Sequence, residues 1–161
     1  MLENNQEAPF FRAVNQDNQL IYLSDYLQKK NVVVYFYPKD DTPGCTIEAN
    51  EFTTLAPAFT ELDTVILGVS KDSCESHRAF IKKFDLTIQL LADTEGTLCE
   101  LFDVWQEVEK DGVKKFKVVR STFIIDKQGQ IREALYNVSP EGHAQAVLEK
   151  INEISQQTNT A

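Results

Sequence analysis

The chain has 161 residues, a length typical of one domain, and its 42% hydrophobic and 25% charged residues are typical of soluble globular proteins. The formal net charge of −9 argues against nucleic acid and anionic membranes as partners, because binding to either depends on Lys and Arg. The sequence contains no apolar run of the ~18 or more residues that a membrane span requires, so we expect no membrane partner.

The chain ends and the cysteines set further expectations. Residues 1–8 and 155–161 are polar, so we expect both to be frayed ends of a single domain spanning 1–161. The start, MLENNQEAPF, has neither a basic segment nor an apolar one, so we expect no secretory signal. Three cysteines without CxxC or zinc-ligand spacing favour a cytoplasmic setting and a catalytic, redox-active or buried thiol over a structural bridge.

The first part of the chain predicts a hairpin and then two strands separated by a helix. Residues 12–26 predict an N-terminal β-hairpin. The β-branched and aromatic run at 32–37 predicts a strand buried on both faces, and 64–70 predicts a second such strand. Residues 45–56 show helical spacing of apolar side chains, and Pro57 should kink or end that helix.

The middle of the chain predicts two helices and a short strand. Residues 71–84 predict a helix with Asp72 or Ser73 as its N-cap, and a strand follows at Gln89–Ala92. A second helix is predicted over 94–105, since its apolar residues recur at helical spacing. These residues are Leu98, Leu101, Phe102 and Trp105.

The last part predicts a hairpin and a closing helix. Residues 117–125 and 130–136 flank the turn-rich stretch DKQG, which favours an antiparallel pair. Residues 139–154 predict a helix with Ser139 as N-cap and Pro140 at its first position. The whole pattern predicts an α/β domain of thioredoxin-like arrangement, with a mixed central β-sheet flanked by helices and an N-terminal β-hairpin extension.

One cysteine is predicted to occupy a reactive position. Cys45 follows Thr-Pro-Gly at the start of a helix after a buried strand, where unpaired N–H groups and the helix dipole favour an anion. Pro43 and Gly44 shape the turn before it. Thiols react as thiolates, and lowering a thiol pKa from about 8.5 to about 6 is worth about 3.4 kcal/mol. Because the dipole supplies at most ~2 kcal/mol, a nearby cation is required.

Two polar residues are candidates to assist the thiol. Arg120 lies inside a strand pattern, where a charge is costly unless it faces water or a partner. Its guanidinium can hold a thiolate and a substrate oxygen together. Thr42, three residues before Cys45, has a hydroxyl that can both donate and accept a hydrogen bond, and it can also serve as an N-cap.

These residues match the active-site pattern of a known family. Pro38, Thr42 and Cys45 fit the P-x-x-x-T-x-x-C pattern of the peroxiredoxins, and Arg120 in RSTFIID resembles that family's active-site arginine. The resemblance spans residues 9–154 and is most specific for the bacterioferritin comigratory protein, or PrxQ-type, subfamily. The stretches that carry it are YFYPKDDTPGCTIEANEF, GVSKDSCESHRAF, LLADTEGTLCELFDVW and RSTFIIDKQGQI.

The resemblance implies a thiol-dependent peroxidase that reduces hydrogen peroxide and organic hydroperoxides. Cys45 would attack one peroxide oxygen and become a sulfenic acid. Arg120, Thr42 and backbone N–H groups of the turn would stabilise the charge that moves to the leaving oxygen, and Pro38 would shield the site. Pro43 and Gly44 of this turn are assigned to peroxide binding.

The resemblance also implies the partners. The reductant would be thioredoxin or a similar dithiol, no metal, haem or flavin is needed, and members of the subfamily are often monomers. Many members carry a resolving cysteine five residues after the first, but here that position is Asn50. Three routes remain open: resolution by Cys74, expected to be exposed in the next helix; by the semi-buried Cys99; or by an external thiol.

Two alternatives use the same fold. A thiol–disulfide oxidoreductase is disfavoured because CxxC is absent, and a non-catalytic redox sensor or binding module is disfavoured because Thr42, Cys45 and Arg120 are all present. His77 is expected to be an exposed helix residue without a role in catalysis or metal binding. The pair Asp40-Asp41 is expected to be solvated surface.

Overall fold

The computed structural model describes the backbone of residues 1–159 and the side chains as far as residue 157. The strands of the main sheet are β1 (Arg12–Asn15), β2 (Leu20–Tyr22), β3 (Asn31–Phe36), β4 (Thr64–Ser70), β5 (Gln89–Ala92), β8 (Ser121–Ile125) and β9 (Ile131–Tyr136). A separate pair is β6 (Trp105–Lys110) and β7 (Val113–Val118). The helices are α1 (Pro43–Glu61), α2 (Cys74–Phe84), α3 (Thr97–Leu101) and α4 (His143–Asn159), with a 3-10 turn, η1 (Leu23–Asp25).

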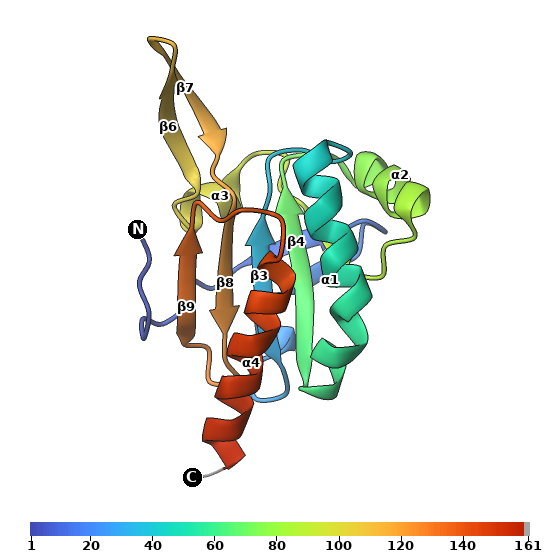
Figure 1. Ribbon diagram of the computed structural model, residues 1–161, viewed down its shortest axis with the longest axis vertical. Coiled ribbons are helices and arrows are strands. Elements are labelled where there is room, and N and C mark those ends of the chain that lie inside the picture. Colours follow the sequence, from blue (N-terminus) through green and yellow to red (C-terminus); the bar gives the residue numbers. More distant parts are fainter. Residues whose placement is uncertain (160–161) are drawn as a thin grey trace.

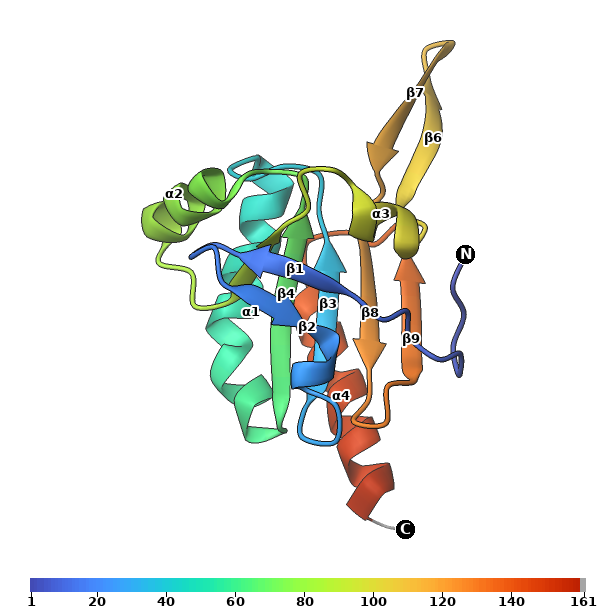
Figure 2. The same ribbon diagram turned by 180° about the vertical axis from the view of Figure 1, so that it is seen from behind.

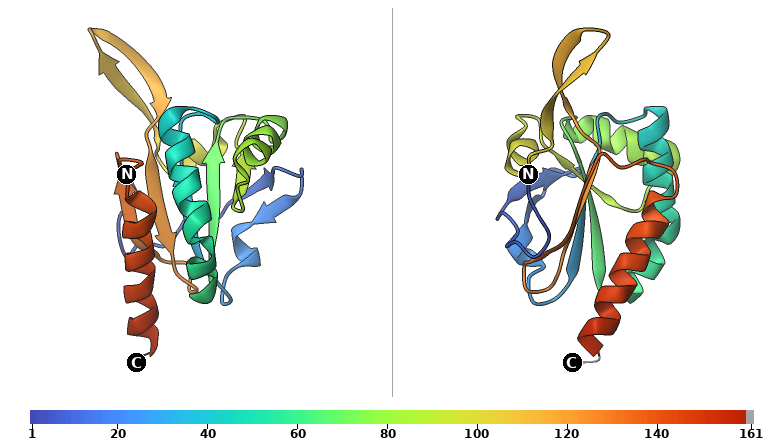
Figure 3. Two further views of the ribbon diagram at one scale, coloured as in Figure 1. Left: turned by 45° about the vertical axis from the view of Figure 1, so that its right-hand side comes forward. Right: turned by 60° about the vertical axis from the view of Figure 1, so that its left-hand side comes forward.

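The main sheet is seven-stranded and mixed, in the order β2-β1-β5-β4-β3-β8-β9. The pairs β3–β4 and β4–β5 are parallel, whereas β3–β8 and β8–β9 are antiparallel. Helices α1 and α4 cover one face (Figure 1). The β1–β2 hairpin and α3 lie over the opposite face (Figure 2), and the two layers are separated by the sheet in edge-on view (Figure 3). The predicted fold class and N-terminal hairpin are confirmed.

Strand β3 lies between β4 and β8 and is buried on both faces. All six of its residues are buried, and its alternating side chains enter two different cores. Val33 and Tyr35 belong to the core under α1 and α4. Val32 and Phe36 belong to the core on the other side of the sheet, which also contains Phe11. This double burial explains the continuous apolar run of the strand.

The pairing of β3 brings distant segments to one edge of the sheet. Phe36, at the end of β3, pairs with Ser121, at the start of antiparallel β8, and with Val69, near the end of parallel β4. The residues that follow β3 therefore lie beside Arg120, which precedes β8, and beside the β4–α2 connection. This edge is the carboxyl end of the parallel strands, where α/β proteins bind ligands.

The two chain ends are more ordered than expected. In residues 1–8, the N–H groups of Asn5 and Ala8 donate to the carbonyls of Ile131 and Gly129, and Glu7 forms a bridge with Gln130. At the other end, residues 155–159 continue α4. Residues 160–161, also expected to be frayed, lie outside the described residues.

Two predicted helices differ from the structure in length. Of the two outcomes expected at Pro57, a kink or an end, the end does not occur: α1 continues to Glu61, because Phe52 and Phe59, on either side of the proline, are both completely buried. Their packing outweighs the hydrogen bond that proline cannot make. Helix α3 ends at Leu101, so it is much shorter than the predicted 94–105, and the backbone turns at Asp103, whose φ is 58°.

The end of the predicted helix 94–105 and the start of the predicted last helix both differ from the structure. Trp105, expected in a helix, begins β6, and Leu101, expected on the apolar stripe of that helix, is 41% exposed. The last helix begins at His143 and not at Ser139 or Pro140. Residues 139–142 instead form a turn in which Gly142 has a φ of 75°, a conformation that glycine adopts without strain.

The hairpin β6–β7 was not predicted, and it projects beyond the main sheet (Figure 1). Its second strand, β7, contains the first residues of the predicted strand 117–125. That prediction is therefore divided between β7 and β8, and Arg120 lies in the connection between them. The hairpin is mostly exposed, so its sequence lacks the apolar alternation of a core strand. Its turn, Asp111-Gly112, has positive φ at both residues, and this Asp-Gly pair is the signal that could have revealed it.

Among the helices described, none is both long enough and apolar enough to cross a membrane.

Candidate active site

Cys45 lies in the first turn of α1, as predicted. Thr42 is the N-cap in extended conformation, Pro43 is the first helical residue, and the first helical bond runs from Thr46 N to Thr42 O. The Thr42 side chain does not cap the helix. Within the described residues, the N–H groups of Gly44 and Cys45 therefore have no hydrogen-bond acceptor. Such free N–H groups at a helix N-terminus form a site that favours an anion.

Arg120 places a cation next to the Cys45 sulfur. Its Nη2 lies 3.4 Å from Cys45 Sγ, although the two residues are 75 positions apart. Although burial opposes it, the nearby Glu48 and Cys45 raise the pKa of Arg120 above its ordinary value, so the guanidinium stays charged. A Cβ on Gly44 would lie 3.1 Å from Arg120 Nη2. Glycine at position 44 therefore allows the guanidinium to approach the helix start.

Glu48 is a site residue that the sequence reasoning missed. It lies one turn after Cys45, and its Oε1 accepts from Arg120 Nη1 at 2.7 Å. Its side chain is completely buried, and its Oε2 has no hydrogen-bond partner among the described residues. Burial raises the pKa of Glu48 to about 7, although Arg120 opposes that rise. Glu48 follows Cys45 by three residues, a spacing that places both side chains on the same helix face. This spacing is the sequence signal from which their proximity could have been predicted.

The raised pKa of Glu48 predicts a pH dependence of stability. Because its folded pKa of about 7 exceeds the ordinary 4.5, the folded state binds this proton more tightly. The stabilisation is fully present below about pH 4.5 and is lost as pH rises through about 7, at a cost on the order of 3 kcal/mol. We expect Glu48→Gln to remove this decrease in the free energy of unfolding.

Urea unfolding at about pH 5 and about pH 8 measures the effect. The decrease between the two pH values should be smaller in Glu48→Gln than in the wild type. Glu61→Gln, at an exposed position at the end of the same helix, is the matched control and should follow the wild type. Equal decreases in all three proteins would contradict the assignment.

Thr42 has a defined hydroxyl orientation. Its Oγ1 donates to the carbonyl of Lys39 at 2.8 Å, within the loop between β3 and α1. Because a hydroxyl has one proton and two lone pairs, the oxygen remains available as an acceptor. The candidate role of Thr42 in binding peroxide is therefore compatible with the observed geometry.

The prolines surround the site from several sides. Pro38 is exposed and lines a cavity of about 240 Å³ together with Arg120, Lys117 and Val138. Pro43 is also exposed. The Cγ of Pro140 would lie 3.4 Å from a Cβ on Gly44, so the turn before α4 packs against the start of α1. Cys45 itself is only 2% exposed.

The other two cysteines differ in accessibility. Cys74 is the first residue of α2 and is half-buried, with its Sγ donating to the carbonyl of Asn15 at 3.2 Å. It is therefore less exposed than expected. Cys99 is completely buried, and burial followed by the nearby Asp93 raises its thiol pKa well above the ordinary value. The expectation of a semi-buried Cys99 was wrong. Asn50 is exposed.

Two residues that were expected on the surface are buried next to the site. His77 is 0% and Asp40 is 7% exposed, and His77 Nδ1 lies 2.8 Å from Asp40 Oδ2. The expectation of an exposed His77 and a solvated Asp40 is wrong, because α2 packs over the loop that precedes α1. The sequence contains no local signal of this pair, since the contact joins residues 37 positions apart.

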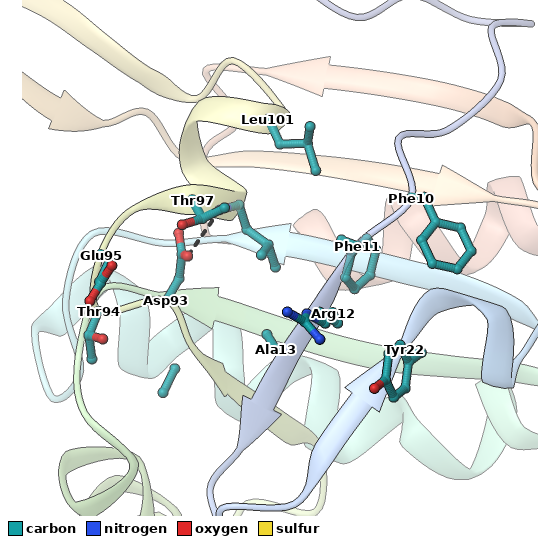
Figure 4. A pocket seen from close by; sticks show the side chains of 12 residues that line it. Phe10, Phe11, Arg12, Ala13, Tyr22, Asp93, Thr94, Glu95, Thr97 and Leu101 are labelled. Atoms are coloured by element: carbon teal, nitrogen blue, oxygen red, sulfur yellow. Dashed lines mark hydrogen bonds between the residues drawn. The ribbon is translucent and has the colours of Figure 1, made fainter.

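A cavity of about 720 Å³ lies elsewhere, between the β1–β2 hairpin and α3 (Figure 4). Its lining includes Phe10, Arg12, Tyr22 and Leu101 but no cysteine. The carboxylate of Asp93 accepts from the N–H groups of Leu98 and Cys99 and so holds α3 in place. This cavity is separate from the candidate active site.

Metal ligands do not gather anywhere in the described part of the chain, where no group of three or more His, Cys, Asp or Glu could hold an ion.

Comparison with known proteins gives a consistent result. The model of the AhpC/TSA family matches residues 5–134. A putative peroxiredoxin bcp of Helicobacter pylori is 44% identical over 150 residues, which cover 93% of this chain and 98% of the relative.

Two solved structures from Xanthomonas campestris are also similar. Peroxiredoxin Q superimposes with a TM-score of 0.86 at 36% identity, covering 90% of this chain and 91% of the other. The bacterioferritin comigratory protein, studied for its alkyl peroxide reduction activity, gives a TM-score of 0.86 at 35% identity, with 90% and 92% covered.

Proposed function

The chain belongs to the AhpC/TSA family and is a peroxiredoxin of the Bcp type, a thiol peroxidase, and we propose that Cys45 is its peroxidatic nucleophile. The observation that carries this assignment is the 3.4 Å contact between Arg120 Nη2 and Cys45 Sγ. The cation lies at a helix start whose N–H groups are unpaired. This arrangement favours a thiolate over a thiol.

The proposed reaction begins with attack by the Cys45 thiolate on one peroxide oxygen. A sulfur–oxygen bond forms as the oxygen–oxygen bond breaks, so cysteine is oxidised to the sulfenic acid and the peroxide is reduced. The leaving oxygen departs as hydroxide or alkoxide and takes a proton to become water or an alcohol. Hydrogen peroxide and organic hydroperoxides are both substrates under this proposal, and Pro38 limits the access of water.

The surrounding groups stabilise the charge that moves from sulfur to the leaving oxygen. Arg120 donates toward sulfur in the resting state and toward the peroxide oxygens in the transition state. The free N–H groups of Gly44 and Cys45, in the turn shaped by Pro43, are further donors. The Thr42 oxygen accepts a hydrogen bond from the peroxide O–H, because its own hydroxyl donates to the Lys39 carbonyl.

Recycling of the sulfenic acid is assigned to Cys74 with a dithiol reductant such as thioredoxin. Of the two remaining cysteines, Cys74 is the more accessible, at the first turn of a helix next to the site. Cys99 is disfavoured because it is buried and its pKa is raised. The proposal describes a single-domain, cytoplasmic monomer without metal or cofactor.

Intact mass and peptide mapping after one equivalent of hydrogen peroxide test this function. In the wild type we expect a loss of about 2 Da and a Cys45–Cys74 cross-linked peptide. In Cys74→Ser we expect a gain of about 16 Da at Cys45, rising to about 32 Da with excess peroxide. The control is Cys99→Ala, which should still form the cross-link.

Two outcomes would contradict parts of the proposal. A gain of about 16 Da at Cys45 in the wild type, without a cross-link, would replace Cys74 by an external thiol but retain the nucleophile. Absence of any oxidation at Cys45 would refute its assignment as the peroxidatic cysteine.

A further inference from the structure

A buried hydrogen-bond network joins the active-site loop to α2. The Asp40 carboxylate accepts three hydrogen bonds: from Tyr37 Oη at 2.5 Å on Oδ1, and from Ser76 Oγ and His77 Nδ1, each at 2.8 Å, on Oδ2. Burial, followed by nearby charges, raises the pKa of Tyr37 well above its ordinary value, so the phenol keeps the proton it donates. Three polar side chains therefore converge on this one buried carboxyl group.

His77 faces acceptors on both sides of its ring. Nδ1 lies against Asp40 Oδ2, and Nε2 lies 2.9 Å from the backbone carbonyl of Leu91 in β5. Both ring nitrogens of His77 therefore face oxygen acceptors, Asp40 on one side and the Leu91 carbonyl on the other. The side chains of His77 and Asp40 are both buried. The Tyr37 hydroxyl lies close to the same ring nitrogen, with its Oη 3.5 Å from His77 Nδ1.

The network ends on the peptide group that orients Thr42. The N–H of Asp40 donates to Asp72 Oδ2 at 2.9 Å, and the carbonyl of the same peptide, on Lys39, accepts from Thr42 Oγ1 at 2.8 Å. Asp72 is itself fixed by Ser70 Oγ at 2.6 Å. A rotation of the Lys39–Asp40 peptide would break both bonds and turn the Thr42 hydroxyl away from its present direction.

We propose that Asp40 and His77 are positioning residues that hold the active-site loop against α2 and thereby set the Thr42 hydroxyl for peroxide. This proposal rests on the proposed function, because it assigns the pair to the same reaction. Neither residue touches the substrate. Their effect passes through the Lys39–Asp40 peptide. Helix α2, to which the pair ties this loop, lies beside the start of α1 (Figures 1 and 3).

The exchange of His77 for either amide tests the proposal. Asn places its side-chain nitrogen near the position of Nδ1, and Gln places it near Nε2. His77→Asn therefore retains the donor to Asp40, whereas His77→Gln retains only the donor to the Leu91 carbonyl. Both variants replace the imidazole by a neutral amide at the same buried position, so each is the matched control of the other.

Stopped-flow measurement of Cys45 oxidation by hydrogen peroxide is the readout. We expect the second-order rate constant to fall by about 10- to 100-fold in His77→Gln, as for a small misplacement of a catalytic group. In His77→Asn it should remain within about 3-fold of the wild type, because the conservative amide restores the bond to the loop. Equal rates in the two variants would overturn the proposal.

A double-mutant cycle with Thr42→Val separates positioning from general destabilisation. If the pair acts through Thr42, His77→Gln should lower the rate by less than about 3-fold once the hydroxyl is absent. Ile131→Val, in the core on the other side of the sheet, is the control and should have the same small effect with and without Thr42. Additive effects of His77→Gln and Thr42→Val would also overturn the proposal.

The two levels of inference fail in different ways. If the wild-type Cys45 does not react with peroxide at all, the proposed function itself fails. If the wild type reacts, and Asn and Gln at position 77 behave alike, only the positioning role of Asp40 and His77 fails. Circular dichroism of each variant confirms that the compared proteins are folded.

Discussion

Replacement of Cys45 by serine should lower kcat/KM for hydrogen peroxide by at least ~10⁴-fold, as expected when a nucleophile is removed. A serine hydroxyl is not ionised at neutral pH and cannot form a stable sulfenic acid equivalent. The surrounding groups, Arg120 and the free N–H groups at the start of α1, would remain in place. They cannot compensate, because they stabilise charge on a sulfur that is no longer present.

The measurement is steady-state peroxide reduction with a saturating dithiol, compared among the wild type, Cys45→Ser and Cys99→Ala. The control variant changes a completely buried cysteine outside the site and should keep activity close to that of the wild type. Full activity of Cys45→Ser would show that another residue is the nucleophile. Loss of activity in Cys99→Ala, with a normal unfolding transition, would also contradict the assignment.

Replacement of Arg120 by lysine should lower kcat/KM by about 10²- to 10³-fold, although the charge is conserved. The guanidinium contacts Glu48 Oε1 at 2.7 Å through Nη1 and Cys45 Sγ at 3.4 Å through Nη2. A lysine ammonium is a single donor group on a flexible chain and cannot reproduce this planar, two-sided contact. Arg120→Met, which also removes the charge, should be at least as severe.

Single-turnover oxidation of Cys45 as a function of pH distinguishes the two roles of Arg120. If the charge stabilises the thiolate, the rate in Arg120→Met should reach its plateau at higher pH than in the wild type. If Arg120→Lys has the same pH profile as the wild type but a lower plateau rate, the lost rate is due to the contact of Arg120 with peroxide. Arg132→Lys, at a partly exposed position in β9, is the control. A wild-type rate in Arg120→Lys would refute the need for a guanidinium.

Much of the fold could be predicted because it depends on local patterns. Residues 64–70 and 89–92 form strands with the predicted bounds. Ser73 caps α2 by accepting from Ser76 N, as one of the two predicted caps. These elements carry strong signals, because a buried strand must be apolar throughout and a helix start needs a side chain that accepts from free N–H groups.

The failures occur where tertiary packing competes with local preference. Pro57 remains inside α1 because buried aromatic residues on both sides hold the helix. The hairpin β6–β7 has little core to bury, so apolar periodicity did not reveal it. Arg120 was placed inside a strand, whereas it lies in the connection between β7 and β8, and its chemical environment depends on that connection.

For the candidate active site, the sequence by itself predicted Cys45 as the nucleophile, its position at a helix start and the residue types around it. Pro38, Thr42 and Cys45 lie within eight residues, and their spacing is a local property. The contact between Cys45 and Arg120 is not local, since only the pairing of β3 with β8 brings the two together.

Only the tertiary structure revealed that Glu48, Asp40 and His77 are buried beside the candidate active site. Each has an ionisable side chain of a kind that is common on protein surfaces. Here each is buried with a partner that is distant in sequence. A buried polar group must find a hydrogen-bond partner, because an unpaired one is costly. Which partner it finds depends on the packing of α1, α2 and the sheet, and that packing is a property of the whole chain and not of any short motif.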